Sequence, residues 1–227
     1  MKFAVGRRRS DQRRYQHPRE ENMGRLPRRL LLAATTLLVA GGVTAVAIQP
    51  ALADQIVTLN FANVTGTTLL AKPKVTATIP KSTINTQVNL TAGTLTGQAQ
   101  IPDLTVHMTL LNLVPVTSTV SIVPTGNLTG TVDLAKSKLT TTTTFTIAVR
   151  NVHVDAVPGL NLVPSGCKTK SPTTATLSNT TPIDIVNGET VSGTYTIPSF
   201  THCGLTTPLL TQLLSGPNNV MTLNLKP

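Results

Sequence analysis

Few side chains after residue 53 are of the types that carry out acid–base catalysis or bind a metal. They include His107, His153, His202, Asp103, Asp133, Asp155, Asp184 and Glu189. His153 and Asp155 lie two residues apart, and Asp103 and His107 four apart, so each pair would share one face of a strand. Either pair could supply a general base with its orienting carboxylate, or half of a metal site. A metal would need further ligands, and no cluster with ligand spacing supplies them, so we expect neither a metal nor a cofactor.

Polar residues that alternate with an apolar row normally face water, which favours solvated surface pairs over a catalytic site. The sequence has no glycine-rich phosphate loop, no Gly-x-Ser-x-Gly motif and no calcium loop. His202 beside Cys203 resembles a nucleophile pair, but neighbours on a strand point to opposite faces. We therefore expect no catalytic residue and a protein that is not an enzyme.

Cys167 and Cys203 are the only cysteines in the chain. In an exported protein, two cysteines predict a disulfide. Closing a loop of this length would stabilise the fold by about 3–4 kcal/mol in the chain-entropy model. A cysteine held in a disulfide is not available as a nucleophile.

The first 53 residues are typical of an export signal. An Arg-rich stretch precedes the apolar segment 30–48, and Pro50 follows it. Ala51 and Ala53 occupy the −3 and −1 positions that signal peptidase reads. The sequence thus predicts a signal peptide over 1–53 and one secreted domain over 54–227.

Other interpretations of the leader stay open. The segment 30–48 is long enough for a single-pass membrane anchor, although threonines and glycines dilute it. Arg28-Arg29 permits twin-arginine export as well as general secretion. Met23 offers a second translation start.

The net charge of +10 belongs mainly to this leader. Of the 19 basic and 9 acidic residues, 10 basic and 3 acidic ones precede Asp54, which leaves +3 for residues 54–227. The remaining lysines are scattered and aromatics are few, which argues against nucleic acid as a partner. With the leader removed, we expect no membrane attachment.

Residues 54–227 are built for strands, because 38 of them are Thr and only one is Glu. Apolar and polar residues alternate with a period of two in several segments. These include 57–61, 75–79, 104–110, 128–134 and 145–149, with further strands near 190–197 and 220–225. We expect an all-β fold of about ten short antiparallel strands, a two-sheet sandwich or alternatively a barrel.

One segment has helical spacing instead. Leu209, Leu210, Leu213 and Leu214 follow Thr207 and Pro208, which predicts a short helix over 208–215 with Thr207 as N-cap. Leucines at this spacing usually cover the protein's own core.

The stretch 193–204, Gly-Thr-Tyr-Thr-Ile-Pro-Ser-Phe-Thr-His-Cys-Gly, is followed by Leu209-Leu210 and by the segment 215–219. Together with Val163-Pro164 before Cys167, it resembles the C-terminal signature of small secreted actinobacterial β proteins of unknown function. The resemblance covers roughly the last 75 residues. It implies an exported β domain with a disulfide and brings no activity.

Two non-catalytic functions remain. The first is a structural or adhesive module of the cell envelope or extracellular space, whose partner is an envelope polymer or protein. The second is a carrier of a lipid or other apolar ligand, held between the sheets or in a barrel. Small aliphatic residues fill a thin sandwich without leaving a cavity, which favours the first function.

Overall fold

The computed structural model describes residues 53–110, 113–184 and 187–227. The segment 30–48, Met23 and Ala51 lie outside the described residues. Residues 50–227 form a compact unit of their own.

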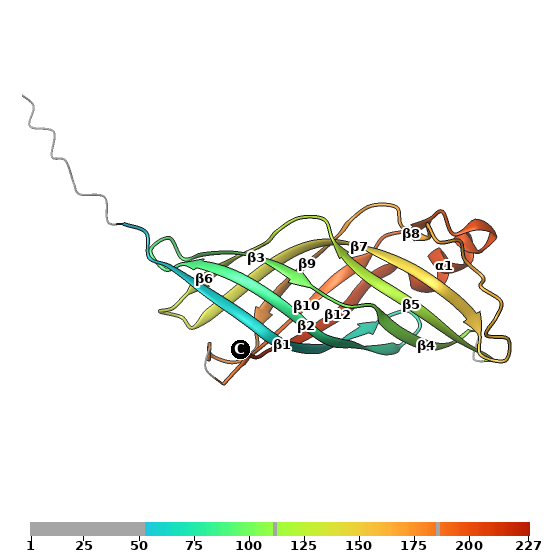
Figure 1. Cartoon of the computed structure of the whole chain (residues 1–227), viewed down its shortest axis with the longest axis horizontal. Coiled ribbons are helices and arrows are strands. Elements are labelled where there is room, and N and C mark those ends of the chain that lie inside the picture. Colours follow the sequence, from blue (N-terminus) through green and yellow to red (C-terminus); the bar gives the residue numbers. More distant parts are fainter. Residues whose placement is uncertain (1–52, 111–112, 185–186) are drawn as a thin grey trace, which may run out of the picture. The chain divides into compact units, whose positions relative to one another are not determined.

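The described residues form twelve strands, one 3₁₀ turn and one α-helix. The strands are β1 (Ile56–Leu70), β2 (Val75–Asn89), β3 (Thr94–Gln100), β4 (Leu104–Leu110), β5 (Val114–Pro124), β6 (Leu128–Asp133), β7 (Lys138–Val154), β8 (Lys168–Thr169), β9 (Thr173–Asn179), β10 (Glu189–Ile197), β11 (Phe200–Thr201) and β12 (Gly216–Leu225). The turn is η1 (Gly204–Thr206) and the helix is α1 (Thr207–Leu214). Figure 1 shows their arrangement.

Eight of these strands close into an antiparallel barrel. β7, β6, β3, β2, β1, β12, β10 and β9 are hydrogen-bonded neighbours in that order, and β9 pairs in turn with β7. Following paired residues around the barrel from Asn89 on β2 returns to β2 at Thr78. The strands are therefore staggered, as closure of a sheet requires.

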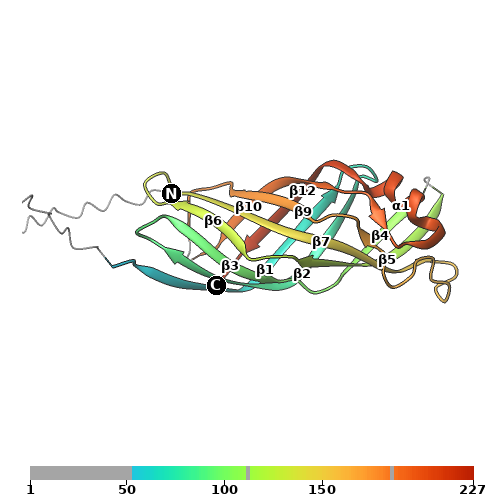
Figure 2. The same cartoon turned by 90° about the horizontal axis from the view of Figure 1, so that it is seen from above.

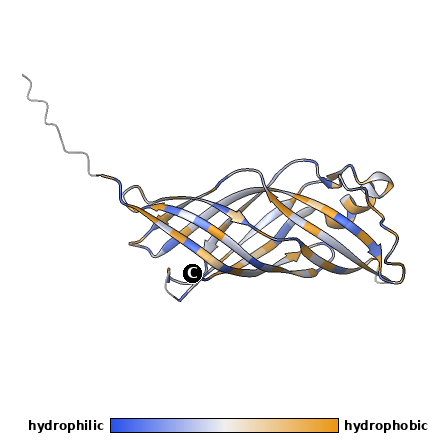
Figure 3. Cartoon of the chain, viewed as in Figure 1, coloured by the Kyte–Doolittle hydropathy of each residue, from blue (hydrophilic) through white to orange (hydrophobic). Residues whose placement is uncertain are grey.

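The inward-facing rows are those that the alternation predicts. Phe145, Ile147 and Val149 on β7 are buried, as are Leu104 and Val106 on β4. Figure 3 shows hydrophobic and hydrophilic residues alternating along the strands. Hydroxyl-bearing residues thus occupy much of the outer surface, and Val, Leu and Ile fill most of the interior.

β1 and β2 are each 15 residues long and change phase part-way. Phe61 and then Val64 face inward, with a register shift between them against β2. A bulge of this kind moves the inward row from odd to even positions and bends the strand. The two strands can therefore line the barrel along its whole length.

The remaining strands extend the barrel at one end. β5 pairs with the C-terminal half of β7, and β4 pairs with β5. At the same end, α1 packs beside β11, opposite the end where β1 begins (Figures 1 and 2). Leu210 and Leu214 of α1 are buried in the core, whereas Leu209 is 43% exposed.

The all-β fold with one short helix and one disulfide is confirmed, and of the two expected architectures the strand pairing shows the barrel. The strands are not all short, because β7 runs for 17 residues. The helix begins at Thr207, with Thr206 as N-cap residue. Thr207 is therefore not the N-cap, and its hydroxyl donates to the Gly204 carbonyl at 2.8 Å. Within the described ranges, no helix has the length and apolar character needed to cross a membrane.

Candidate functional site

Asp103 belongs to a polar cluster on the barrel surface. Both of its carboxylate oxygens accept bonds from the Arg150 guanidinium, at 3.1 and 2.9 Å, and Ser121 Oγ donates to Oδ1 at 2.6 Å. Arg150 Nη2 also contacts Ser121 Oγ. The side chains of Arg150 and Asp103 are 44% and 50% exposed, so solvent screens this ion pair. Asp103 is thus engaged by Arg150 and Ser121 rather than by His107.

The two strand histidines also have other partners than the sequence suggests. The Thr117 hydroxyl donates to Asp155 Oδ1 at 2.7 Å. Because its single proton is used in that bond, Thr117 Oγ1 accepts from His107 Nδ1 at 2.8 Å. His153 Nδ1 donates to the Asn151 carbonyl at 2.9 Å. Both Thr117 bonds lie on the exposed surface, and the Thr117 hydroxyl donates to a carboxylate rather than to a histidine.

The remaining sequence candidates are surface or turn residues. Asp133 pairs with Lys136 at 2.8 Å, and the hydrogen bond from Lys136 lowers the pKa of the Asp133 carboxyl. Asp184 accepts two bonds from Asn187, at 2.9 and 2.8 Å. His202 is exposed and has a positive φ of 57°. In the part of the chain that the structure describes, no three His, Cys, Asp or Glu residues are placed to hold a metal.

Cys167 and Cys203 form the expected disulfide, with an S–S distance of 2.02 Å. Both residues are fully buried, and the bond joins the segment before β8 to the start of η1. Because it ties the chain beside α1 to the segment that pairs with β7, the disulfide fixes the helical end of the barrel.

A mostly apolar cavity of about 220 Å³ lies inside the closed part of the barrel, toward the end where β1 begins. The residues that line it come from all eight barrel strands and three connections. They are Val57, Leu59, Phe61, Ile84, Thr86, Val88, Leu90, Leu95, Leu128, Val132, Leu134, Leu139, Thr141, Leu177, Ile183, Glu189, Val191, Leu223 and Leu225. An apolar cavity of about 150 Å³ is enough to stay dry and bind a single aromatic ring.

The cavity reaches the surface at the end of the barrel where β1 begins. Val57 and Leu90, which line it, are each 39% exposed, and Leu134 is 61% exposed. Ile56, next to Val57, is also 61% exposed. The described lining of the cavity thus continues into partly exposed apolar side chains at this end of the barrel.

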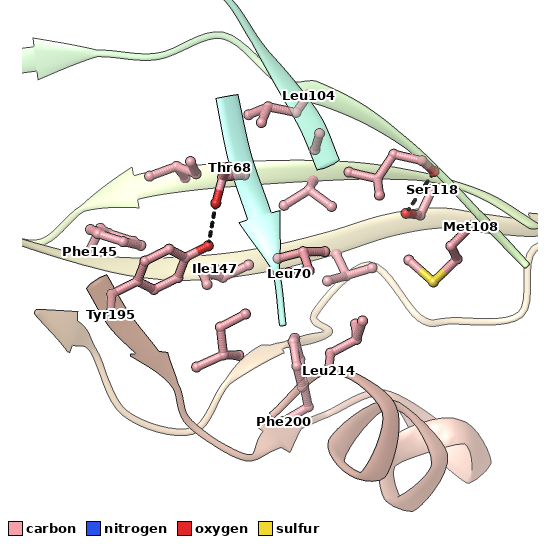
Figure 4. Close-up of a pocket in the computed structure, with 16 residues that line it drawn as sticks. Thr68, Leu70, Leu104, Met108, Ser118, Phe145, Ile147, Tyr195, Phe200 and Leu214 are labelled. Atoms are coloured by element: carbon pink, nitrogen blue, oxygen red, sulfur yellow. Dashed lines mark hydrogen bonds between the residues drawn. The ribbon is translucent and has the colours of Figure 1, made fainter. Parts of the chain in front are cut away.

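The other half of the barrel is packed more tightly. Figure 4 shows its interior, where Leu70, Leu104, Ile147 and Leu214 project toward a residual space of about 40 Å³. Such a space holds at most a water molecule or two. The ligand-sized cavity and the tightly packed core thus occupy opposite halves of one barrel.

Glu189 is the acidic residue that lines the large cavity, and its side chain is only 3% exposed. Oε2 accepts a hydrogen bond from the Asp184 backbone N–H at 3.0 Å. Oε1 is buried and has no hydrogen-bond partner among the described residues.

The sequence did contain a signal for this placement. Glu189 is in phase with Val191, Tyr195 and Ile197, all of which face inward on β10. A strand with a period of two puts residue 189 on the same face as these three. From the sequence, Glu189 is named only among the residues that could do chemistry, and the structure shows that it is buried.

No protein-family model, curated protein or solved structure matches this chain. The resemblance of its C-terminal stretch to secreted actinobacterial proteins therefore stays a prediction. The geometry of the cavity is what bears on function.

Proposed function

We propose that this protein is a non-catalytic, exported binding protein that holds one small apolar ligand inside its barrel. The observation that carries the proposal is the cavity of about 220 Å³, lined almost entirely by Val, Leu, Ile and Phe. Ligand sites are typically concave and largely apolar, with a few polar groups. An eight-stranded barrel is wide enough to hold one such molecule.

Export is the second part of the proposal. The leader sequence with Ala51 and Ala53 supports it, and so does the disulfide between Cys167 and Cys203, because such bonds persist in oxidising compartments. N-terminal sequencing of the protein from its host's medium tests this part. A first residue of Asp54 is expected, whereas recovery only in membranes would favour an anchor at 30–48.

The binding test uses the neutral, polarity-sensitive dye prodan. Because the chain has no Trp, the dye's emission is read against little protein fluorescence. We expect saturable binding of one dye per chain, with a blue shift. Val88 is 3% exposed and lines the cavity, so Val88→Phe should fill part of it and weaken binding about tenfold or more.

Val123→Phe is the matched control, because Val123 is 48% exposed and does not line the cavity. Binding to this variant should equal that of the wild type. Non-saturable dye binding, or equal binding to Val88→Phe with its fold intact, would contradict the proposal.

A structural or adhesive module remains a second candidate, and a row of hydroxyls around the outside of the barrel favours it. Paired residues on successive strands form this row: Thr140, Ser178, Ser192, Thr222, Thr67 and Thr78. Thr140 and Ser178 hydroxyls lie 3.2 Å apart, and those of Ser192 and Thr222 lie 3.0 Å apart. Four of the six hydroxyls thus bond to each other in pairs, which leaves those four less free for a polymer.

A further inference from the structure

Glu189 is the only Glu after residue 53, and β10 aims it into the barrel. Its neighbour two positions along, Val191, also lines the cavity. The backbone bond from Asp184 N–H to Oε2, at 3.0 Å, fixes one carboxylate oxygen. The other oxygen, Oε1, is buried without a partner in the described ranges.

None of the described residues donates a hydrogen bond to Glu189 Oε1. The described residues that line the cavity include no Lys, Arg or His. The hydroxyls of Thr86 and Thr141, the two threonines of the lining, donate to the carbonyls of Leu59 and Leu177, at 3.0 and 3.5 Å. The polar groups of the cavity wall are thus already used within the barrel, except for Oε1.

A buried carboxylate oxygen without a donor is costly, because desolvation is not repaid by a hydrogen bond. In a cavity that binds a ligand, a donor on that ligand can supply the missing bond. Hydrogen bonds to a charged acceptor are stronger than those between neutral groups. A single polar atom in an apolar cavity also fixes the orientation of whatever binds there.

We infer that Glu189 Oε1 is the anchor for an amphipathic ligand that has an apolar body and one hydrogen-bond donor, either an amine or a hydroxyl. This inference rests on the proposed ligand-binding function and adds the chemical class of the ligand. The apolar body lies among the aliphatic side chains of the cavity, and the donor group meets Oε1.

The test compares three ligands of the same length on the full-length protein by isothermal titration calorimetry at neutral pH. 1-Octylamine is a donor only, 1-octanol is both donor and acceptor, and 2-octanone is an acceptor only. We expect the amine and the alcohol to bind about tenfold or more tightly than the ketone, because the ketone leaves Oε1 unpaired. The ratio of the affinities for the amine and the alcohol then shows which of the two donor types the site prefers.

Glu189→Gln reverses the chemistry of this position while conserving the shape of the side chain. Its amide oxygen can keep the bond from Asp184 N–H, which turns the NH₂ group toward the cavity. The amine should lose about tenfold in affinity and the ketone should gain. Thermal unfolding of the variant shows whether it is folded, and the wild-type comparison of the three ligands does not depend on the variant.

Equal affinity of the wild type for all three ligands would overturn the role of Glu189 and leave the cavity as a general apolar site. Preference for the ketone would overturn it too, because the ketone has no donor to offer Oε1. If neither these ligands nor prodan binds, the result contradicts the proposed ligand-binding function itself, and with it the role of Glu189. Val88→Phe should weaken the binding of all three ligands by the same factor. This distinguishes the effect of cavity volume from the effect of the Glu189 carboxylate.

Discussion

Tyr195 contributes a buried polar contact to the tightly packed half of the barrel. The side chain is 6% exposed, and its hydroxyl lies 2.7 Å from Thr68 Oγ1 (Figure 4). Its ring packs edge-on against Phe145, with ring centroids 5.9 Å apart. Burial raises the pKa of the Tyr195 phenol, and the hydrogen bond with Thr68 partly opposes this. The folded state therefore favours the protonated phenol.

This shift has a consequence for stability at high pH. Below about pH 10, where an unfolded tyrosine keeps its proton, the contribution of Tyr195 is fully present. As the pH rises past that value toward the raised pKa, the unfolded state loses its proton first, and the free energy of unfolding falls. In Tyr195→Phe, the decrease in the free energy of unfolding that comes from ionisation of Tyr195 should be missing. Denaturant unfolding of both proteins between about pH 9 and pH 11 measures the difference.

At neutral pH the same variant should be less stable by about 1–2 kcal/mol, because Thr68 Oγ1 loses its partner in a buried site. Equal pH dependence of the two proteins would contradict the assignment to Tyr195. Lysines also titrate in this range, but they are common to both proteins, so only the difference between the two curves is interpreted.

At the scale of the elements, two strand glycines allow the barrel wall to form. A Cβ on Gly193 of β10 would fall against the Thr176 carbonyl oxygen of β9, and one on Gly66 of β1 would fall against the Thr222 carbonyl of β12. Both obstacles are backbone atoms, which cannot move without disturbing the strand pairing. These glycines therefore permit a close approach of neighbouring strands.

Gly193→Ala should lower the free energy of unfolding by about 1–3 kcal/mol, since the added methyl overpacks a rigid contact. Gly126→Ala is its matched control, because nothing lies within 4 Å of the position of the new Cβ. That variant should change the stability by less than about 0.5 kcal/mol. Thermal or denaturant unfolding measures both. A similar change in stability for the two substitutions would mean that the close contact at Gly193 does not destabilise the Ala variant.

The elements themselves could be predicted well from the sequence, because a strand's inward row depends mainly on its own residues. Phe145, Ile147 and Val149 show this for β7. The change of phase at Phe61 and Val64 could not be predicted, because a bulge depends on how β1 pairs with β2. The burial of Glu189 was not predicted, although its phase on β10, shared with Val191 and Tyr195, indicates it.

At the scale of the whole molecule, the alternation of apolar and polar residues did not predict that the barrel closes. The decisive contact is between β9 and β7, where Thr173–Ser178 pair with Thr140–Phe145. A sandwich would use the same inward and outward rows and leave β9 at an edge. Only the pairing of segments distant in the sequence separates the two architectures, and the cavity exists because the sheet closes.

Closure can be tested by hydrogen exchange, because it determines which amides have partners. β9 pairs with β10 on one side and with β7 on the other, so its amides should be protected on both sides. β4 pairs with β5 alone among the described strands, so alternate amides of β4 should lack a ladder partner. Amides in the β9 segment 174–178 should all exchange about a hundredfold or more slowly than the unpaired set in β4. Residue-resolved NMR measures this, and fast exchange at every second amide of β9 would mean that the barrel is open along the β7–β9 seam.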